Sequence, residues 1–351
     1  MYEEMPEDAI GRHRNRITPT GVEGNGGDMQ EIPGENGAVP RRKVAVVGTG
    51  LVGSSFAYAL MIRGIASELV LIDTNAKKAV GEMMDFNHGL SFVRPMRISA
   101  GGYADLAGSS VVVIAAGASQ RPGETRLDLL SRNAAIFRSI IPEVVRHNPN
   151  GIILIATNPV DILTSISLTE SHLPPSRVIG SGTILDTSRF RFLLSQYYGV
   201  DARSVHAYIV GEHGDSEIPL WSLASIGGVR LQEFAPLRNK TYDQQQMDRL
   251  FVSVRDAAYE IIRRKGSTSY AIGLGLLSIV EAILGDHRTV LSVSTLMTGQ
   301  YGVRDICLSL PCVVGANGVE EVLTLNLSPL EEEGFRNSAQ KLASTLASLP
   351  R

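Results

Sequence analysis

One histidine stands between small and acidic residues in the segment 211–215, Gly-Glu-His-Gly-Asp. His213 follows a strand-like segment over residues 205–210, so we expect its ring at a strand end, exposed to a cleft. Asp186 is its candidate partner, within a helix predicted over residues 184–199. A buried carboxylate on one ring nitrogen would orient the ring and raise its pKa. The other nitrogen could then exchange a proton with a substrate hydroxyl.

A candidate clamp for an anionic substrate lies on the same helix. Arg189 follows Asp186 by three residues, which places both on one helix face. A guanidinium binds a carboxylate through two parallel hydrogen bonds, and Arg189 could hold a substrate in this way. A polar, glycine-punctuated stretch over residues 117–126 follows the strand predicted over residues 111–116. Ligands of open α/β sheets bind at this edge, and such a stretch can act as a lid.

The motif Gly48-Thr49-Gly50-Leu51-Val52-Gly53 stands between a predicted strand and a predicted helix. Gly48 would allow a tight turn, Gly50 the close approach of a pyrophosphate, and Gly53 the packing of helix on strand. Asp73 ends the next apolar run, near the spacing of an acid that binds ribose hydroxyls and repels a 2′-phosphate. The motif therefore favours NAD, with a glycine-rich turn of an unrelated α/β protein as the alternative.

Apolar runs alternate with helical segments from residue 41 onward. Strands are predicted over residues 44–47, 69–73, 111–116, 152–156 and 178–179, and helices over residues 51–63 and 75–87. This alternation predicts βαβ units and a parallel sheet that is buried on both faces. We predict an α/β protein with an N-terminal Rossmann domain, a doubly wound parallel sheet, over residues 41–182. A mixed α+β catalytic domain is predicted over residues 183–351, where the rhythm is less regular.

Composition narrows the class of protein. The chain has 351 residues, of which 44% are hydrophobic and 20% charged, with a net charge of −3. This balance predicts no nucleic-acid or membrane partner. Two cysteines form neither a disulfide framework nor a zinc site, and no metal is predicted. We expect a soluble, cytoplasmic protein. Residues 1–40, rich in Gly, Glu and Pro, predict a disordered tail, with an arm that docks on a neighbouring subunit as the alternative.

The chain resembles the bacterial-type NAD-dependent L-lactate dehydrogenases of the lactate/malate dehydrogenase superfamily over residues 41–350. The motifs that carry this resemblance are GTGLVG, GASQRPGETR, ATNPVD, GSGTILDTSRFR and GEHGDSEIPLWS, in this order. The resemblance implies reversible hydride transfer between NADH and pyruvate, giving L-lactate and NAD⁺. It also implies a homotetramer.

The resemblance gives each matching residue an expected role. His213 is expected to donate and accept the proton, Asp186 to orient it, and Arg126 to polarise the reacting carbonyl when the lid closes. The expected substrate-binding residues are Gln120, Arg126, Asn158, Asp186, Arg189 and Thr268. The expected NAD contacts are Gly48, Gly50, Val52, Gly53, Asp73, Lys78, Tyr103, Gly117, Ala118, Ser139, Thr157 and Asn158.

Gln120 separates lactate from malate as the expected product. Malate carries a second carboxylate, and the family pattern places an arginine for it six residues before the lid arginine. The neutral Gln120 stands there and suits a methyl group, while Glu124 disfavours a dicarboxylate. Arg121 beside it keeps a malate dehydrogenase or a broader 2-hydroxyacid dehydrogenase open as the alternative. A non-catalytic NAD-binding descendant is disfavoured, because every expected catalytic residue is present.

A regulatory site is also expected. Arg191 lies about 200° round an ideal helix from Arg189, so it should face away from the active site. With His206 it resembles the site at which bacterial members of the family bind fructose 1,6-bisphosphate between subunits. The alternative is that both residues only form hydrogen bonds at an interface.

Overall fold

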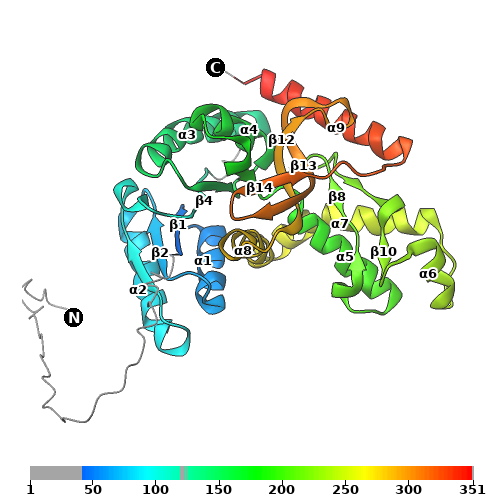
Figure 1. The fold of residues 1–351 in the computed structure, drawn as a ribbon, viewed down its shortest axis with the longest axis horizontal. Coiled ribbons are helices and arrows are strands. Elements are labelled where there is room, and N and C mark those ends of the chain that lie inside the picture. The colour runs from blue at the N-terminus through cyan, green and yellow to red at the C-terminus, as the bar shows by residue number, and fades with distance from the viewer. Residues whose placement is uncertain (1–41, 119–122, 124, 350–351) are drawn as a thin grey trace, which may run out of the picture. The chain divides into compact units, whose positions relative to one another are not determined.

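Six parallel strands form one end of a nine-stranded sheet, from its edge strand inward (Figure 1). They are β1 (Lys43–Val47), β2 (Glu68–Ile72), β3 (Arg97–Ala100), β4 (Val111–Ile114), β5 (Ile152–Ile155) and β6 (Val178–Gly180). In space their order is β3-β2-β1-β4-β5-β6, the order of a dinucleotide-binding Rossmann sheet. The predicted fold class is therefore confirmed. The computed structural model describes residues 42–118, 123 and 125–349, so the predicted tail 1–40 lies outside the described residues.

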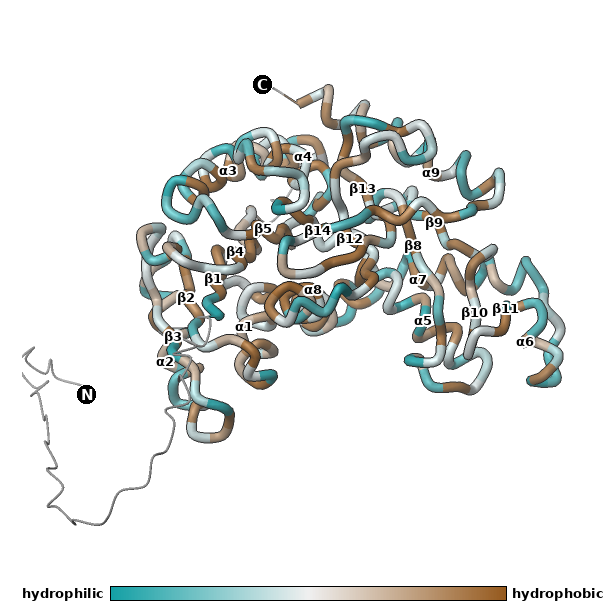
Figure 2. The backbone as a smooth tube through the Cα atoms, viewed as in Figure 1, coloured by the Kyte–Doolittle hydropathy of each residue, from teal (hydrophilic) through white to brown (hydrophobic). Residues whose placement is uncertain are grey.

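Helices cover both faces of this sheet. They are α1 (Leu51–Arg63), α2 (Ala76–Gly89), α3 (Arg126–His147), α4 (Val160–Ser171) and, from the second half of the chain, α8 (Tyr270–Gly285). Alternate residues of a strand point to opposite faces. Val44 and Val46 therefore share a core with α1 and α8, whereas Ala45 and Val47 share one with α3 and α4. The hydrophobic colour along β1, β4 and α8 in Figure 2 follows this burial.

Three long antiparallel strands extend the same sheet beyond β6. They are β12 (Thr289–Thr298), β13 (Arg304–Gly315) and β14 (Gly318–Val322). β12 pairs with β6 through Ser294 and Gly180, and a side chain at Gly180 would collide with Thr164 and Ser294. The second half of the chain is thus joined to the Rossmann sheet by strand pairing as well as by the packing of α8 on α1.

A third core lies among α5, α6, α7 and the short strands near them (Figure 1). Its helices are α5 (Ile184–Tyr198), α6 (Leu231–Leu237) and α7 (Gln244–Lys265). Helix α9 (Pro329–Ala347) packs instead on α4 and β13 and belongs to the core shared with α3. The strands are β7 (Val205–His206), β8 (Ile209–Val210), β9 (Ile218–Pro219), β10 (Ser225–Ile226) and β11 (Val229–Arg230). Phe190 meets Trp221 edge to face in this core, with ring centroids 4.8 Å apart.

The single strand predicted over residues 205–210 is wrong. The run divides into β7, which pairs with β10, and β8, which pairs with β9 in a separate sheet. The division places Ala207 between two sheets, where its carbonyl accepts a hydrogen bond from Arg191 instead of a neighbouring strand. The strand-like pattern could not show this change of partner, because the partners β10 and β9 lie further along the chain and only the fold brings them beside the two halves.

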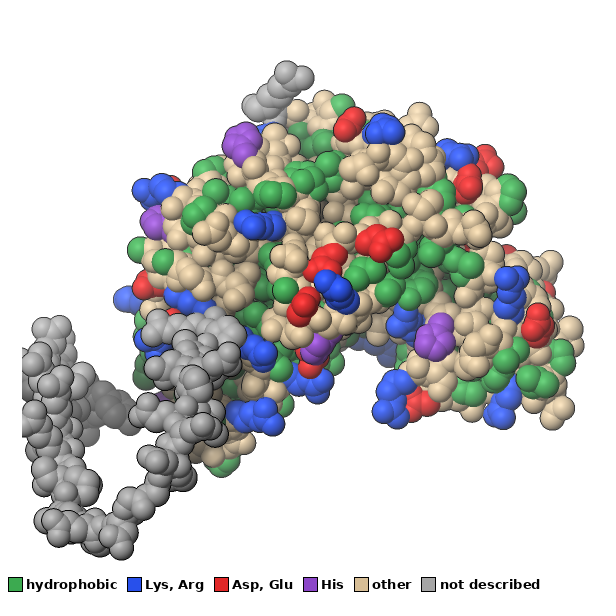
Figure 3. Space-filling view, viewed as in Figure 1, with side chains coloured by type: hydrophobic (Ala, Val, Ile, Leu, Met, Phe, Trp, Pro, Cys, Tyr) green, Lys and Arg blue, Asp and Glu red, His purple; other side chains and the backbone are tan. Residues whose placement is uncertain are grey.

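Two surface properties accompany this fold. Within the described residues, no helix combines the length and the apolar character that crossing a bilayer would require. On the face shown in Figure 3, acidic and basic side chains are interspersed, and neither negative nor positive side chains gather into one patch there.

Candidate functional site

The turn between β1 and α1 is built on glycine. Gly48 has φ +99°, and a Cβ there would lie 2.4 Å from the backbone nitrogen of Ala116. A Cβ at Gly53 would lie 2.0 Å from the carbonyl oxygen of Gly48. By contrast, nothing comes within 4 Å of a Cβ placed at Gly50. Two glycines thus permit close packing, and the third leaves open space at the start of α1, where free N–H groups favour a phosphate.

Asp73, just beyond the end of β2, is tied to this glycine turn. Its carboxylate accepts hydrogen bonds from the Thr49 backbone N–H at 2.8 Å and the Thr49 hydroxyl at 3.0 Å. The N–H of Asn75 donates to its other oxygen at 2.9 Å. Burial acts to raise the pKa of Asp73, and these hydrogen bonds outweigh it and lower the pKa. Asp73 is therefore ionised at neutral pH, as an acid that binds ribose hydroxyls must be.

A cavity of about 770 Å³ opens at the carboxyl ends of β1, β2 and β4. It brings together seven of the expected NAD contacts: Gly48, Gly50, Asp73, Lys78, Tyr103, Gly117 and Ser139. The remaining five, Val52, Gly53, Ala118, Thr157 and Asn158, are not among the described residues that line it. The open space at Gly50, the ionised Asp73 and the size of this cavity fit a dinucleotide.

Ala118 and Thr157 lie at the ends of neighbouring strands. The N–H of Ala118 donates to the side chain of Asn133 at 2.8 Å, and the hydroxyl of Thr157 donates to the Ala116 carbonyl at 2.8 Å. A side chain at Gly117 would lie only 2.5 Å from the Thr157 methyl group. These contacts hold the ends of β4 and β5 together beside the 770 Å³ cavity.

His213 and Asp186 form the predicted pair. The Nδ1 of His213 lies 2.5 Å from Oδ2 of Asp186, which is on the first turn of α5 and only 2% exposed. The Nη1 of Arg189 donates to the other oxygen, Oδ1, at 2.9 Å. One buried carboxylate therefore positions both the imidazole and the guanidinium, and Nε2 of His213 is left for a substrate.

The charges of this pair stabilise one another. Burial acts to lower the pKa of His213, but the Asp186 carboxylate outweighs it and raises the pKa to about 9. Burial acts to raise the pKa of Asp186, and the charge of His213 outweighs it in turn. At neutral pH the pair is an imidazolium beside a carboxylate, which makes His213 a proton donor.

A second buried carboxylate anchors the backbone of His213. Oδ2 of Asp161 accepts the His213 N–H at 2.7 Å from the first turn of α4. Burial raises the pKa of Asp161 to about 6, although its contact with His213 opposes the shift. Sequence reasoning gave Asp161 no role. The available signal was its place at the end of the motif ATNPVD, three residues after Asn158.

Residues from both halves of the chain line a cavity of about 510 Å³. It is lined by four predicted residues, Asn158, Asp186, Arg189 and His213, together with Arg255 of α7 and Lys341 of α9. Glu217 also lines it and was not predicted. Asp186, His213 and Glu217 each have a donor atom within 4.8 Å of the others, a spacing that a metal ion could use. Arg189 and Arg255 share the cavity, and their charges oppose a further cation.

For three predicted substrate residues, the structure gives either no side-chain position or a position outside the lining of this cavity. Gln120 lies outside the described residues. Arg126 is the first residue of α3, which begins with a capping box between Thr125 and Asp128, and its side chain lies outside the description. Thr268 lies in the connection between α7 and α8 and is not among the described residues that line the 510 Å³ cavity.

Arg191 and His206, the predicted effector pair, lie away from that cavity. Arg191 lines a separate cavity of about 280 Å³ with Tyr208, whose ring centroid is 5.0 Å from its guanidinium carbon. Its Nε donates to the Ala207 carbonyl at 3.0 Å. His206, next to Ala207 on β7, is exposed. The two side chains thus belong to one local region outside the substrate cavity.

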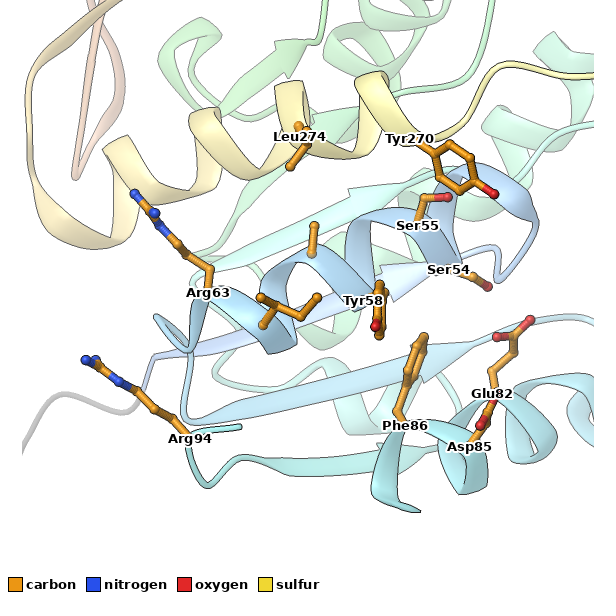
Figure 4. A pocket seen from close by; sticks show the side chains of 12 residues that line it. Ser54, Ser55, Tyr58, Arg63, Glu82, Asp85, Phe86, Arg94, Tyr270 and Leu274 are labelled. Atoms are coloured by element: carbon orange, nitrogen blue, oxygen red, sulfur yellow. The ribbon is translucent and has the colours of Figure 1, made fainter. Parts of the chain in front are cut away.

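A further cavity of about 840 Å³ lies between the exposed faces of α1, α2 and α8 (Figure 4). Tyr58 and Phe86 face each other across it, with ring centroids 6.4 Å apart. Arg63 and Arg94 lie at one end, and Glu82 and Asp85 at the other (Figure 4). None of the predicted site residues lines it among the residues described.

Comparison with known proteins agrees with this geometry. Residues 42–180 match the family model described as lactate/malate dehydrogenase, NAD binding domain. Residues 183–349 match the one described as lactate/malate dehydrogenase, alpha/beta C-terminal domain.

Named relatives and solved structures share most of the chain. The L-lactate dehydrogenase of Acetivibrio thermocellus is 51% identical over 308 residues, covering 88% of this chain and 97% of that protein. The L-lactate dehydrogenase of Priestia megaterium is 52% identical over 305 residues, 87% and 95% of the two chains. The ligand-bound minor L-lactate dehydrogenase of Enterococcus mundtii superposes with a TM-score of 0.86 at 43% identity, covering 89% of this chain and 99% of that one. The chain belongs to the lactate/malate dehydrogenase family, whose N-terminal domain binds NAD.

Proposed function

We propose that this protein is an NAD-dependent L-lactate dehydrogenase that interconverts pyruvate and L-lactate. The observation that carries the proposal is the placement of His213 and Arg189 on the two oxygens of the buried Asp186 carboxylate. This arrangement presents a proton donor and an anion clamp side by side, which a 2-oxo acid requires. The relatives named L-lactate dehydrogenase, about half identical in sequence, support the choice of lactate.

The mechanism follows from the charges of the site. NADH, when bound, supplies the hydride that reaches the carbonyl carbon of pyruvate. Arg189 binds the substrate carboxylate with the guanidinium nitrogens that Asp186 does not use. The imidazolium of His213 donates its Nε2 proton to the carbonyl oxygen, where negative charge would otherwise develop. Arg126 and Gln120, at the predicted lid, complete the site in this proposal. In the reverse direction neutral His213 accepts the hydroxyl proton of lactate.

We place the two activities in the predicted parts of the chain. Residues 41–182 hold the dinucleotide, and residues 183–351 supply Asp186, Arg189 and His213 for the substrate. A malate dehydrogenase remains the second candidate, because Arg255 and Lys341 add cations to the substrate cavity. Steady-state oxidation of NADH with pyruvate and with oxaloacetate decides between the two. We expect a strong preference for pyruvate, and a preference for oxaloacetate would overturn the assignment.

We further propose regulation by fructose 1,6-bisphosphate at Arg191 and His206. His206 is exposed, the carbonyl of the next residue, Ala207, accepts a hydrogen bond from Arg191, and neither side chain lines the substrate cavity, which supports an anion site there. Assembly into a homotetramer is part of the same proposal, since the effector would lie between subunits. Apolar side chains that are exposed around the 840 Å³ cavity, such as Tyr58, Ile62 and Leu274, support an interface on that side (Figure 4). A cytoplasmic location stays a prediction from the sequence.

A further inference from the structure

Glu217 is a buried acid in the substrate cavity that the mechanism above does not use. It lies four residues after His213, and its N–H donates to the Gly214 carbonyl at 3.2 Å. The residue is 6% exposed, and it lines the cavity with Asp186 and Arg189. Its Oε1 is fully buried and has no hydrogen-bond partner among the described residues. An ionised carboxylate with an orphaned oxygen in such a place is costly, whereas a neutral acid is much less so.

Charged groups face Glu217 from the elements around the cavity. Those that shift its pKa most are Asp186 and Arg189 of α5, His213 in the preceding turn and Arg255 of α7. The cavity is also lined by Glu212, Asp215 and Lys341. Asp186 and His213 compensate each other as an ion pair at 2.5 Å. Burial first, and then the Asp186 carboxylate, raise the pKa of Glu217 to about 9 against the pull of the cations. Glu217 is thus a neutral carboxylic acid at neutral pH.

We propose that Glu217 controls the binding of the anionic substrate by its proton: neutral, it leaves Arg189 free for the substrate carboxylate, and ionised, it competes for that cation. The inference rests on the proposed dehydrogenase function. With Glu217 neutral, the cations of the cavity (Arg189, protonated His213, Arg255 and Lys341) outnumber its carboxylates (Asp186, Glu212 and Asp215), so an incoming monoanion meets a net positive charge. Loss of the Glu217 proton adds a negative charge in the same cavity. Charges that share a partly buried cavity interact strongly, so this charge should weaken the binding of the anionic substrate by about tenfold or more.

Two protons then govern substrate binding at alkaline pH, one on His213 and one on Glu217. The test compares wild type with Glu217→Gln, which mimics the neutral acid and cannot ionise. The readouts are kcat/KM for pyruvate and the inhibition constant of oxamate, an unreactive amide analogue of pyruvate, from pH 6 to pH 10. We expect the two proteins to agree within about twofold at neutral pH. Above about pH 9, oxamate affinity should fall in both proteins as His213 loses its proton, and the total fall should be about tenfold or more larger in wild type than in Glu217→Gln.

Glu260→Gln is the matched control. Glu260 lies on α7, where it pairs with Arg263 and Arg264 on the surface, so its replacement removes one negative charge, as Glu217→Gln does above about pH 9, without touching the cavity. This variant should keep the steep wild-type profile. Parallel profiles for wild type and Glu217→Gln would overturn the proposal, since a purely structural glutamate leaves the pH dependence unchanged. Tighter oxamate binding by Glu217→Gln at neutral pH would also overturn it, because Glu217 would then already be ionised.

Thermal unfolding tests the proton on Glu217 without relying on activity. Unfolded Glu217 loses its proton near its ordinary pKa of about 4.3, while the folded state holds it up to about pH 9. The unfolded state therefore binds fewer protons between these values, and stability falls as the pH rises. Glu217→Gln removes this penalty, so its Tm should exceed that of wild type more at pH 8 than at pH 5. A difference in Tm that does not vary with pH would overturn the proposal. Absence of pyruvate turnover in wild type would overturn only the proposed function.

Discussion

Arg189 and Asp186, one turn apart on α5, are joined by a hydrogen bond of 2.9 Å between Nη1 and Oδ1. The same carboxylate holds His213 through its other oxygen at 2.5 Å. The guanidinium that would bind the substrate carboxylate and the imidazole that would protonate its carbonyl thus have a common, buried reference point. A disturbance at Asp186 must change both the binding step and the proton transfer.

The Asp186→Asn variant tests this coupling. It keeps the shape of the side chain but removes the charge that raises the pKa of His213 to about 9. The pKa of His213 should fall toward or below its ordinary value of about 6.5, so the alkaline limb of pyruvate reduction should move to lower pH. We expect kcat/KM for pyruvate at pH 7.5 to fall by about a hundredfold or more. Asp201→Asn, at an exposed ion pair with Arg203, is the control. An unmoved alkaline limb would contradict the role of Asp186.

Local pattern was sufficient to predict the parts of the site that depend on a turn or a helix face. The glycine turn at Gly48 and the i, i+3 spacing of Asp186 and Arg189 depend on contacts only a few residues apart. Asp161 and Glu217 could not be found in this way. Asp161 meets a backbone N–H that is 52 residues away, and Glu217 is buried in a cavity that it shares with residues of α5 and α7.

Strand pairing in the second half of the chain could not be predicted from local sequence pattern either. β12 pairs with β6 through Ser294 and Gly180, and nothing in the sequence of β12 indicates which strand it pairs with. Residues 205–210 form one strand-like run, yet they change sheets between β7 and β8. In both places long-range packing decides which edge a strand meets, and a hydrophobic run is compatible with several edges.

Gln120→Arg tests the prediction that a neutral side chain in the lid selects pyruvate. An arginine at this position would supply a charge-assisted hydrogen bond to the second carboxylate of oxaloacetate. We expect the ratio of kcat/KM for oxaloacetate to that for pyruvate to rise by about 10- to 100-fold. Gln232→Arg, on the exposed face of α6, adds the same charge away from the cavity and should leave the ratio unchanged. An unchanged ratio in Gln120→Arg would refute the assignment of lactate specificity to Gln120.

The effector site is tested by titrating fructose 1,6-bisphosphate into the wild-type enzyme and into Arg191→Gln and His206→Gln. If the phosphates bind at these side chains, the effector should lower the KM of wild type for pyruvate by about fivefold or more. Both variants should require much higher effector concentrations, because each removes a phosphate contact. Arg203→Gln removes an exposed arginine that pairs with Asp201 and should respond as wild type does. A wild-type KM that is insensitive to the effector at pH 6 and at pH 7.5 would rule out the regulation.

Two glycines of the β1–α1 turn should separate folding from cofactor binding. Gly48→Ala forces a side chain into φ +99° and against the Ala116 backbone, so we expect a loss of about 1–3 kcal/mol in the free energy of unfolding. Gly50 has φ −70°, which alanine adopts freely, and its Cβ would meet nothing within 4 Å. Gly50→Ala should therefore unfold as wild type does in denaturant. Its methyl group would occupy the space that a pyrophosphate approaches, so the Kd for NADH should rise by about tenfold or more. Equal NADH affinity in Gly50→Ala and wild type would place the pyrophosphate elsewhere.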